Sequence, residues 1–383
     1  MSSEHEQARF PLRRVALLGG GRWSRVLLPV IQSLLVEDAE IVWVTKHGYE
    51  PARRWLTDRA IERVSVQTDV DLAVAAIDAA VVATSPATHG WQVHQLLQRG
   101  IPTLCEKPFT LDFDEAVALH RMAADAGCPL GVNLEMYFAS FVEDFAAAVL
   151  GRSVYKIEIT WSDPWSESRY GETKYGDIYT SIVDDMWPHC WSLLRRLCPR
   201  CNVDLVEEVR YEPSSGLVHI SVRIKELVAT IVLSRRSDRR SRRIEVNNGA
   251  AVLDFSTEPG STEIDGAVSI NEWRGSRPLS RSLSSFFEAI LVPELDPEWA
   301  LSACLDSVRT AQMIGDQLRR LQRVRLNGLR DTGLELADEA HRNLIVDLLL
   351  PEYGTKDRRP AITMEDQIAF VRHVCATQGI RYR

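Results

Sequence analysis

A lysine between a glutamate and a proline ends the short apolar run in "IPTLCEKPFTL", residues 101–111. Such a run is typical of a buried strand, and ligands of open α/β sheets bind beyond the carboxyl ends of the strands. Pro108 restricts Lys107 to extended geometry and could form a cis bond, which would fix the direction of the ammonium group. A fixed ammonium group can donate a hydrogen bond to a developing alkoxide or, with a depressed pKa, transfer a proton. Glu106 and Lys107 are therefore candidates for a ligand site, although most lysines are only solvated.

A glycine-rich loop offers a second chemistry, the binding of a pyrophosphate. In "VALLGGGRWSRVLLPVI", Gly19, Gly21 and Ser24 have the spacing G-x-G-x-x-S between an apolar run and a helical pattern. Gly19 would permit a tight turn, and Gly21 would let the backbone approach a pyrophosphate at the helix N-terminus. Ser24 replaces the usual Gly or Ala and is still small. This position favours a dinucleotide site, although any tight strand-to-helix turn can contain glycines.

The second apolar run favours NADP(H) over NAD(H) as the dinucleotide. NAD sites commonly carry Asp or Glu at the end of the second strand, where it binds the ribose hydroxyls. Here "IVWVTKHG" ends in Thr45 and Lys46. A missing carboxylate and an available ammonium suit a 2′-phosphate, and Arg53 and Arg54 are near enough in sequence to assist. The alternative is that Lys46 is a solvated loop residue.

Both motifs depend on an alternation of apolar runs and helical patterns in the first third of the chain. This alternation predicts βαβ units and a parallel sheet. Helices are expected at about residues 23–35, from about Pro51, in "HGWQVHQLLQRG" and in "DFDEAVALHRMAADAG". The predicted strands are "RVALLGG", "AEIVWVT", "AAVVAT", "IPTLCEKP" and "PLGVNLEM".

The pattern changes from about Val154 to longer, partly alternating runs, which suit an antiparallel sheet with one covered face. They include "VYKIEITWSD", "GLVHISVRI" and "LVATIVLSRR", and "NNG" at residues 247–249 predicts a hairpin turn. Helices are expected at about residues 183–197 and 297–320. The role of the mixed helical sequence after about Gly328 is not evident.

Composition excludes several classes of protein. The 383 residues are 45% hydrophobic and 26% charged, as in a globular protein of two domains. No apolar run approaches the ~20 residues of a membrane helix. A net charge of −8 disfavours a nucleic-acid partner. The first residues lack the apolar core of a secretory signal, so a cytoplasmic location is expected.

Two local features have plain interpretations. The basic stretch "SRRSDRRSRR" at residues 234–243 is expected to be a solvated turn beside a strand. The seven cysteines are an odd number, so free thiols are expected. Cys198 and Cys201 form an isolated "CPRC" without a second pair, and no metal site is predicted.

Together, "GGGRWS" and "TSPATHGWQVHQLLQRGIPTLCEKPFTLDFDEAVAL" make residues 12–325 resemble the glucose-fructose oxidoreductase and inositol dehydrogenase family, Gfo/Idh/MocA. The resemblance implies an N-terminal Rossmann domain and a C-terminal α/β domain with a large, open, mainly antiparallel sheet. We place these domains at residues 1–135 and 136–330, with an extension of unknown role at 331–383. The family usually transfers hydride between NAD(P) and sugars, polyols or related carbonyl compounds, and its active-site lysine corresponds to Lys107.

The resemblance also implies an Asp and a His four residues apart in the second domain. Asp185 and His189 fit, since positions i and i+4 share one helix face. With Lys107 they would surround a reacting carbonyl or hydroxyl, with His189 as acid-base group and Asp185 orienting it or the substrate. Alternatively, Asp184 or Asp185 is only an N-cap with Pro188 in the first turn, and His189 is a satisfied, half-buried histidine.

The chain departs from the family at two places. Trp187 and Pro188 stand where the family often has Gly, and Tyr137 precedes Phe138 where it often has Arg. Tyr137 is a candidate substrate contact. Trp165 is another, in an aromatic and charged stretch for which a packed loop is the alternative. The cofactor-binding candidates are Gly19, Gly21, Arg22, Trp23, Ser24, Thr45, Lys46, Thr84, Ser85, His89, Glu106 and Lys107.

The sequence therefore predicts an NADP(H)-dependent oxidoreductase of a polar carbonyl or hydroxyl compound such as a sugar or sugar nucleotide. The alternatives are an imine reductase of specialised metabolism and an inactive nucleotide-binding regulatory or scaffold protein. The partners expected are a small-molecule substrate and further copies of the chain, with no nucleic acid and no membrane. A dimer or tetramer would cover the open sheet.

Overall fold

The structure is a computed structural model that describes residues 10–69, 76–169, 172–175, 178–200, 202–292, 301–353 and 363–383. It divides into two compact units. Unit 1 is Met1–Ser140 with Trp273–Arg309, and unit 2 is Phe141–Glu272 with Thr310–Arg383. The linear boundaries predicted at residues 135 and 330 did not include the return of residues 273–309 to unit 1.

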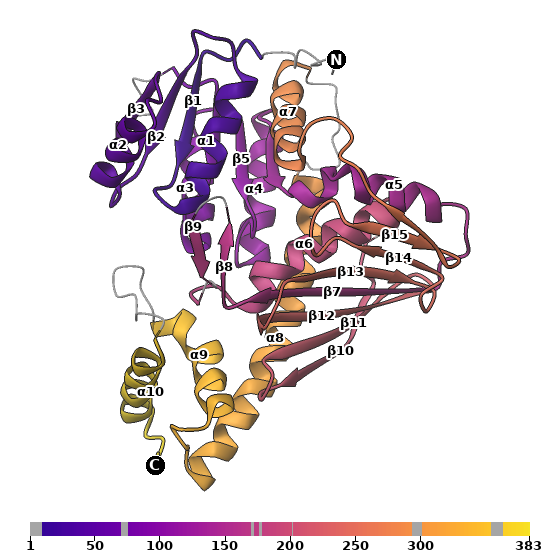
Figure 1. The fold of residues 1–383 in the computed structure, drawn as a ribbon. Helices are drawn as coiled ribbons and strands as arrows, with labels where there is room; N and C mark the ends of the chain where they lie inside the picture. Colours follow the sequence, from indigo (N-terminus) through magenta and orange to yellow (C-terminus); the bar gives the residue numbers. More distant parts are fainter. Residues whose placement is uncertain are drawn as a thin grey trace. The chain divides into compact units, whose positions relative to one another are not determined.

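Unit 1 is built on a six-stranded sheet in the order β3-β2-β1-β4-β5-β6, and every neighbouring pair is parallel. This order and the alternating helices form a doubly wound Rossmann domain, as predicted (Figure 1). Most of these strands are buried apolar runs, whereas β3, which the sequence analysis did not identify, is only half-buried. The strands are β1 (Arg14–Leu18), β2 (Glu40–Val44), β3 (Val64–Gln67), β4 (Ala79–Val82), β5 (Thr103–Glu106) and β6 (Leu130–Asn133). The helices are α1 (Arg22–Leu34), α2 (Tyr49–Asp58), α3 (Pro86–Leu97) and α4 (Phe113–Asp125), followed by the 3-10 turn η1 (Glu135–Phe138).

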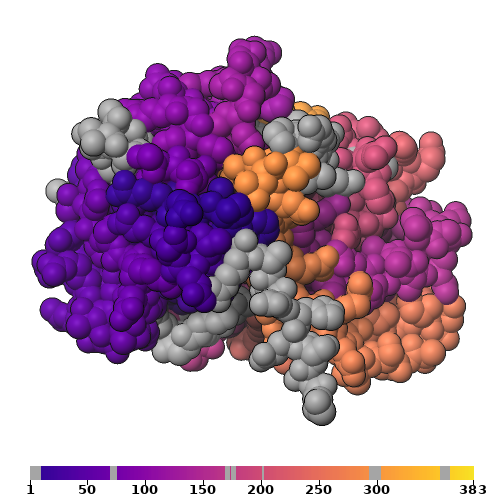
Figure 2. Space-filling view, turned by 90° about the horizontal axis from the view of Figure 1, so that it is seen from above, coloured from indigo at the N-terminus to yellow at the C-terminus, as the bar shows by residue number. Residues whose placement is uncertain are grey.

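A late helix, α7 (Pro278–Leu291), completes the core of unit 1. Its buried Leu283, Phe286 and Phe287 join the cluster formed by the strands and α1, and Phe287 makes an edge-on contact with Phe10. Figure 2 shows α7, in orange, beside the indigo surface of the N-terminal residues. The sequence analysis did not predict this helix, although burying its large side chains stabilises unit 1.

Unit 2 contains an eight-stranded sheet in the order β10-β11-β12-β7-β13-β14-β15-β16. All neighbouring pairs are antiparallel except β12 with β7, which confirms the predicted mainly antiparallel sheet. Asn247, Asn248 and Gly249 adopt positive φ between β13 and β14, as the predicted hairpin turn requires. The strands are β7 (Lys156–Pro164), β10 (Leu205–Glu212), β11 (Leu217–Ile224), β12 (Leu227–Ser237), β13 (Ser241–Val246), β14 (Ala251–Asp254), β15 (Ser261–Ile264) and β16 (Ala267–Ile270), and β8 (Ser166–Arg169) pairs separately with β9 (Glu172–Tyr175).

Helices complete unit 2. Within it, α6 (Ile182–Leu197) packs against β7 and β12, and α5 (Ser140–Val149) precedes the sheet (Figure 1). Three helices follow the sheet: α8 (Leu301–Thr332), α9 (Glu339–Tyr353) and α10 (Met364–Gln378). The helix predicted at about residues 297–320 corresponds to α8, and the start of that range lies outside the described residues. The end of α8 packs with α9 and α10 around a separate apolar cluster.

Candidate functional site

The first glycine of the loop is confined by its surroundings. Gly19 has a φ of +134°, and a Cβ atom there would lie 2.3 Å from the carbonyl oxygen of Ala83. Its N–H donates to the carbonyl of Val44 at 2.9 Å, and its own carbonyl accepts from the Trp43 indole at 2.6 Å. Only glycine fits this position, which lies between the ends of three strands.

The second functional glycine faces open space. Gly21 begins α1 without a side-chain cap, and the first turn of α1 holds no acidic residue. A Cβ atom on Gly21 would meet nothing within 4 Å. Ser24 is buried, and its hydroxyl lies 2.9 Å from where a Cβ on Gly19 would stand, so the helix packs closely on the turn. An accessible helix start with no side-chain cap and no acidic residue in its first turn fits a pyrophosphate.

Glu106, at the end of β5, is part of a buried hydrogen-bond chain. Its Oε1 accepts from the Trp23 indole and from Asn133 Nδ2, both at 2.6 Å. Ser282 on α7 in turn donates to Asn133 Oδ1 at 2.7 Å. Burial raises the pKa of Glu106, while these two hydrogen bonds and the charge of Lys107 oppose that rise. Trp23 and Glu106 therefore tie the glycine loop to the strand end that carries Lys107.

Lys107 follows directly after β5, half-buried, and its bond to Pro108 is cis, the geometry considered in the sequence analysis. Beside it, His89 is buried with Nδ1 2.8 Å from the Pro108 carbonyl and Nε2 3.3 Å from the Thr84 carbonyl. Ser85 is the N-cap residue of α3. His89 therefore connects the segment that follows β4 with the segment that follows β5.

Two cofactor-binding candidates, Thr45 and Lys46, follow β2, and they differ in exposure. Thr45 is buried, and its hydroxyl accepts from the Gly48 N–H at 3.1 Å. Lys46 is exposed, as are Arg53 and Arg54 on α2. The cations at this strand end are therefore accessible to an anion, whereas Thr45 shapes the backbone.

In unit 2, α6 begins at a cap that the sequence analysis did not identify. The Ser181 hydroxyl accepts from the Asp184 N–H at 3.0 Å and donates to the Asp184 carboxylate at 2.6 Å. The alternative in which Asp184 or Asp185 caps the helix is therefore wrong, and Pro188 lies beyond the first turn. Burial raises the pKa of Asp184. Asp185 lies half-buried in the first turn of the helix.

His189 stacks on Trp161 of β7, with the ring centroids 4.6 Å apart and the planes at 11°. The guanidinium of Arg242 lies over the same indole ring, 3.8 Å from its centroid. Arg242 is buried, pairs with Asp163 and donates to the carbonyl of Ser162 at 2.6 Å. Burial lowers its pKa to about 10, so it remains a cation at neutral pH. Trp161 and Arg242 therefore fix the plane of the His189 ring.

The candidate substrate contacts are packed residues. Tyr137 lies in η1 and makes an edge-on contact with Phe138, their centroids 5.5 Å apart. Trp165 packs against the apolar cluster of α8, α9 and α10, and the Arg236 guanidinium lies 5.7 Å from its ring centroid. Both side chains are half-buried, and their role as substrate contacts stays a prediction. The nearby residues 170, 171, 176 and 177 lie outside the described residues.

The structure tests the predictions made for the basic stretch at residues 234–243 and for the cysteines. Arg235 and Arg242 are 4% and 2% exposed, so the prediction of a solvated turn is wrong for these two side chains. Cys198 is a free thiol, as are the other cysteines that the structure describes, while Cys201 lies outside the described part. In the described ranges, His, Cys, Asp and Glu side chains form no group of three or more able to hold a metal ion. Among the described helices, none is long and apolar enough to cross a membrane.

Sequence comparison identifies the domain that holds the glycine loop. Residues 13–134 match the Gfo/Idh/MocA family profile, described as an oxidoreductase family with an NAD-binding Rossmann fold. Residues 13–134 are therefore similar to the NAD-binding domain of the Gfo/Idh/MocA family. The recognition made from the sequence motifs is therefore confirmed.

Curated relatives align with this chain over part of their length only. Myo-inositol dehydrogenase Hyg17 of Streptomyces leeuwenhoekii is 34% identical over 105 residues, which are 27% of this chain and 32% of that protein. Rhizopine catabolism protein MocA of Rhizobium meliloti is 30% identical over 147 residues, 36% and 44% of the two chains. The chain thus spans about a third of the length of the first inositol dehydrogenases that it matches.

Solved structures extend the likeness to both sheets of the Gfo/Idh/MocA fold. UDP-N-acetylglucosamine 3-dehydrogenase GnnA from Acidithiobacillus ferrooxidans has a TM-score of 0.64 and 19% identity, covering 79% of this chain and 96% of that one. At this identity the likeness concerns the fold alone. About a fifth of this chain therefore lies outside the alignment with a nearly complete neighbour.

Several residues of this chain became evident only from the structure. Asn133 and Ser282 support Glu106, while Trp161 and Arg242 support His189. The sequence could have indicated a role for Asn133, because it is a polar residue at the end of an otherwise apolar strand. No local sequence pattern indicated the roles of Ser282 and Arg242, because their hydrogen-bond partners are distant in sequence.

Proposed function

We propose that the chain is an NADP(H)-dependent oxidoreductase acting on a polar carbonyl or hydroxyl compound, such as a sugar or sugar nucleotide. When bound, the nicotinamide supplies or accepts a hydride. The observation that carries the proposal is the uncapped, accessible start of α1 at Gly21 within a domain of an oxidoreductase family. The names of an inositol dehydrogenase and a sugar-nucleotide dehydrogenase among the similar proteins support the substrate class.

The preference for NADP(H) rests on the end of β2. Lys46 is exposed there, Arg53 and Arg54 are exposed on the following helix, and the two residues after β2, Thr45 and Lys46, are not carboxylates. The hydrogen bond of an ammonium group to the anionic 2′-phosphate of NADP(H) is stronger than its hydrogen bond to the neutral ribose hydroxyl of NAD(H). Lys46 is the group that should discriminate between the two dinucleotides.

The experiment is a titration with NADPH and with NADH, followed by energy transfer from the tryptophans to the reduced nicotinamide. We expect NADPH to bind more tightly, and Lys46→Ala to weaken NADPH by about tenfold while leaving NADH unchanged. Comparable affinities for the two dinucleotides would remove the preference. Binding of neither would favour the regulatory or scaffold alternative.

We further propose that Lys107 and His189 carry the proton in the reaction and that Asp185 orients the imidazole or a substrate hydroxyl. Lys107 stands at a strand end braced by Glu106 and His89, and His189 is held by its stack on Trp161. Unchanged turnover in His189→Asn would remove that residue from the mechanism, and a loss of about a hundredfold is expected. Substrates should be screened among both carbonyl and imine compounds.

A homo-oligomer, dimer or tetramer, is proposed to cover the open face of the eight-stranded sheet. Alternate residues of β11 and β12 are only half-buried on that face, among them Leu217, Val228 and Val232. Sedimentation of a monomer only, at micromolar concentration, would contradict this assembly. A cytoplasmic location remains a prediction.

A further inference from the structure

The segment that leads into α6 belongs to the apolar cluster of the C-terminal helices. Ile178 is buried in that cluster with residues of α8, α9 and α10, and Tyr179 packs against it. Thr180 and the cap residue Ser181 follow immediately. The C-terminal helices therefore support the residues that start α6.

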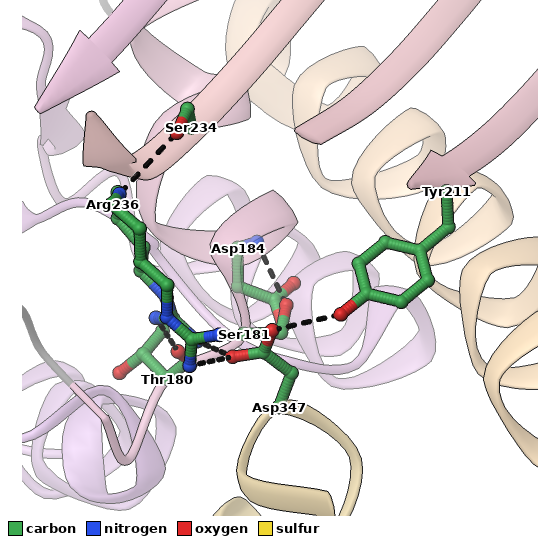
Figure 3. A network of polar contacts seen from close by, with 8 residues as sticks. Thr180, Ser181, Asp184, Tyr211, Ser234, Arg236 and Asp347 are labelled. Atoms are coloured by element: carbon green, nitrogen blue, oxygen red, sulfur yellow. Dashed lines mark hydrogen bonds and ion pairs between the residues drawn. The ribbon is translucent and has the colours of Figure 1, made fainter. Parts of the chain in front are cut away.

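A largely buried carboxylate on α9, that of Asp347, links the same helices to the same segment. Asp347 accepts from the Tyr211 hydroxyl at 3.1 Å, from Arg236 at 3.1 Å and from Arg235 at 3.4 Å. Figure 3 shows Asp347 reaching from α9 toward the side chains of Tyr211 and Arg236. The Asp347 side chain is only 11% exposed, so its charge needs these partners.

Arg235 connects Asp347 to the segment that precedes α6. A second nitrogen of its guanidinium, Nη1, donates to the carbonyl of Thr180 at 2.7 Å. Thr180 directly precedes Ser181, whose hydroxyl organises the first turn that contains Asp184 and Asp185. A guanidinium can hold a carboxylate and a carbonyl at once in a fixed geometry, which a lysine cannot reproduce.

We propose that Asp347 is a positioning residue that holds Arg235 against Thr180 and thereby fixes the start of α6, which carries Asp185 and His189. The C-terminal helices, whose role the sequence did not reveal, would then be an integral support of the proposed active site. This inference rests on the proposed function for its catalytic consequence. Its structural part stands without it.

The test compares Asp347→Asn, which removes the charge, with Asp347→Glu, which keeps it. The matched control is Glu352→Gln on the same helix, because Glu352 faces Arg323 in an exposed pair with a 3.9 Å separation. Hydrogen exchange, read by mass spectrometry, reports on the amides of residues 181–190, and those of α7 serve as an internal reference.

We expect exchange in the first turn of α6 to accelerate about tenfold in Asp347→Asn, to recover in Asp347→Glu and to be unchanged in Glu352→Gln. With an active substrate, kcat should fall about tenfold in Asp347→Asn while the dissociation constant of NADPH stays within about twofold. Unchanged exchange at α6, or equal acceleration in Glu352→Gln, would overturn the proposal. So would wild-type kcat in a variant whose α6 exchange is accelerated.

The two proposals can fail separately. If the wild-type protein binds no dinucleotide, the proposed function fails while the exchange measurement still decides the role of Asp347. If Asp347→Asn does not fold, Arg235→Lys takes its place, since a lysine keeps a cation for Asp347 but cannot hold Asp347 and the Thr180 carbonyl at once in the same fixed geometry. Faster α6 exchange in Arg235→Lys supports the proposal, and wild-type exchange overturns it.

Discussion

Helices α1 and α6 carry the two halves of the proposed chemistry and begin in opposite ways. α1 starts at Gly21 with no side-chain cap and no acidic residue in its first turn. α6 starts at Ser181, which caps the Asp184 N–H, and its first turn contains Asp184 and Asp185. A helix start without a side-chain cap or an acidic residue can bind an anion, whereas a capped, acidic start favours helix stability and orients its own side chains.

The largest effect should come from Gly19→Ala, which tests whether the turn before α1 requires glycine. The new Cβ would stand 2.3 Å from the Ala83 carbonyl oxygen at a φ of +134°, so we expect a loss of about 3 kcal/mol in the free energy of unfolding. Gly100→Ala is the control, because Gly100 also has positive φ but a Cβ there meets nothing within 4 Å. Urea denaturation measures both, and equal losses would show that the clash contributes nothing.

Gly21→Asp would give α1 the kind of start that α6 has. Gly21 has extended backbone geometry and room for a side chain, so the carboxylate can cap the helix and raise the free energy of unfolding by about 0.5–1 kcal/mol. The same charge should weaken NADPH binding by at least about tenfold through repulsion of the phosphates. Gly21→Ser is the neutral control. Wild-type NADPH affinity in Gly21→Asp would contradict a pyrophosphate site at this helix.

Ser181→Ala makes the converse change and removes the cap of α6. We expect a loss of about 1 kcal/mol in the free energy of unfolding, because the Asp184 N–H and carboxylate both lose a partner. Ser181→Thr keeps a hydroxyl and should retain most of the stability. Thermal denaturation measures the difference, and NADPH affinity should not change, since the dinucleotide is proposed to bind unit 1.

Glu106→Gln should produce the smallest effect, and one that depends on pH. The amide oxygen of the glutamine can still accept hydrogen bonds from Trp23 and Asn133. The substitution removes the buried carboxyl group, whose pKa is raised. The stability that a protonated Glu106 contributes is present below its ordinary pKa and is lost as pH rises through the raised value. The variant should therefore gain stability relative to wild type as pH rises above the ordinary pKa of a glutamate, as melting curves can show. A difference independent of pH would contradict this account.

Local sequence patterns predicted much of unit 1. The alternation of apolar runs and helical patterns led to its parallel sheet, and the glycine spacing led to Gly19 and Gly21 at the start of α1. These features depend on side-chain periodicity and on turn residues within a short segment, so they can be predicted without knowledge of the tertiary structure. The helix α7 escaped prediction because its role, to complete the core of unit 1, depends on residues far away in the chain.

The arginine-rich stretch shows the limit of such reasoning. As sequence, residues 234–243 are a run of charges, and such runs are usually solvated. In the fold, Arg235 meets Asp347 across a sequence separation of 112 residues, and Arg242 meets Asp163 across 79. Burial of a charge is favourable only when a partner is in place, and only the folded chain supplies that partner.

Neighbouring residues encode the likeness to the Gfo/Idh/MocA family, the two sheet types, the glycine loop and the strand-end position of Lys107, so these features could be predicted from the sequence. The tertiary structure alone decided which polar groups support them: Asn133 and Ser282 behind Glu106, Trp161 and Arg242 beside His189, and Asp347 behind the start of α6. The physical reason is that hydrogen bonds, stacking and buried ion pairs act over a few ångströms of space, whatever the separation along the chain.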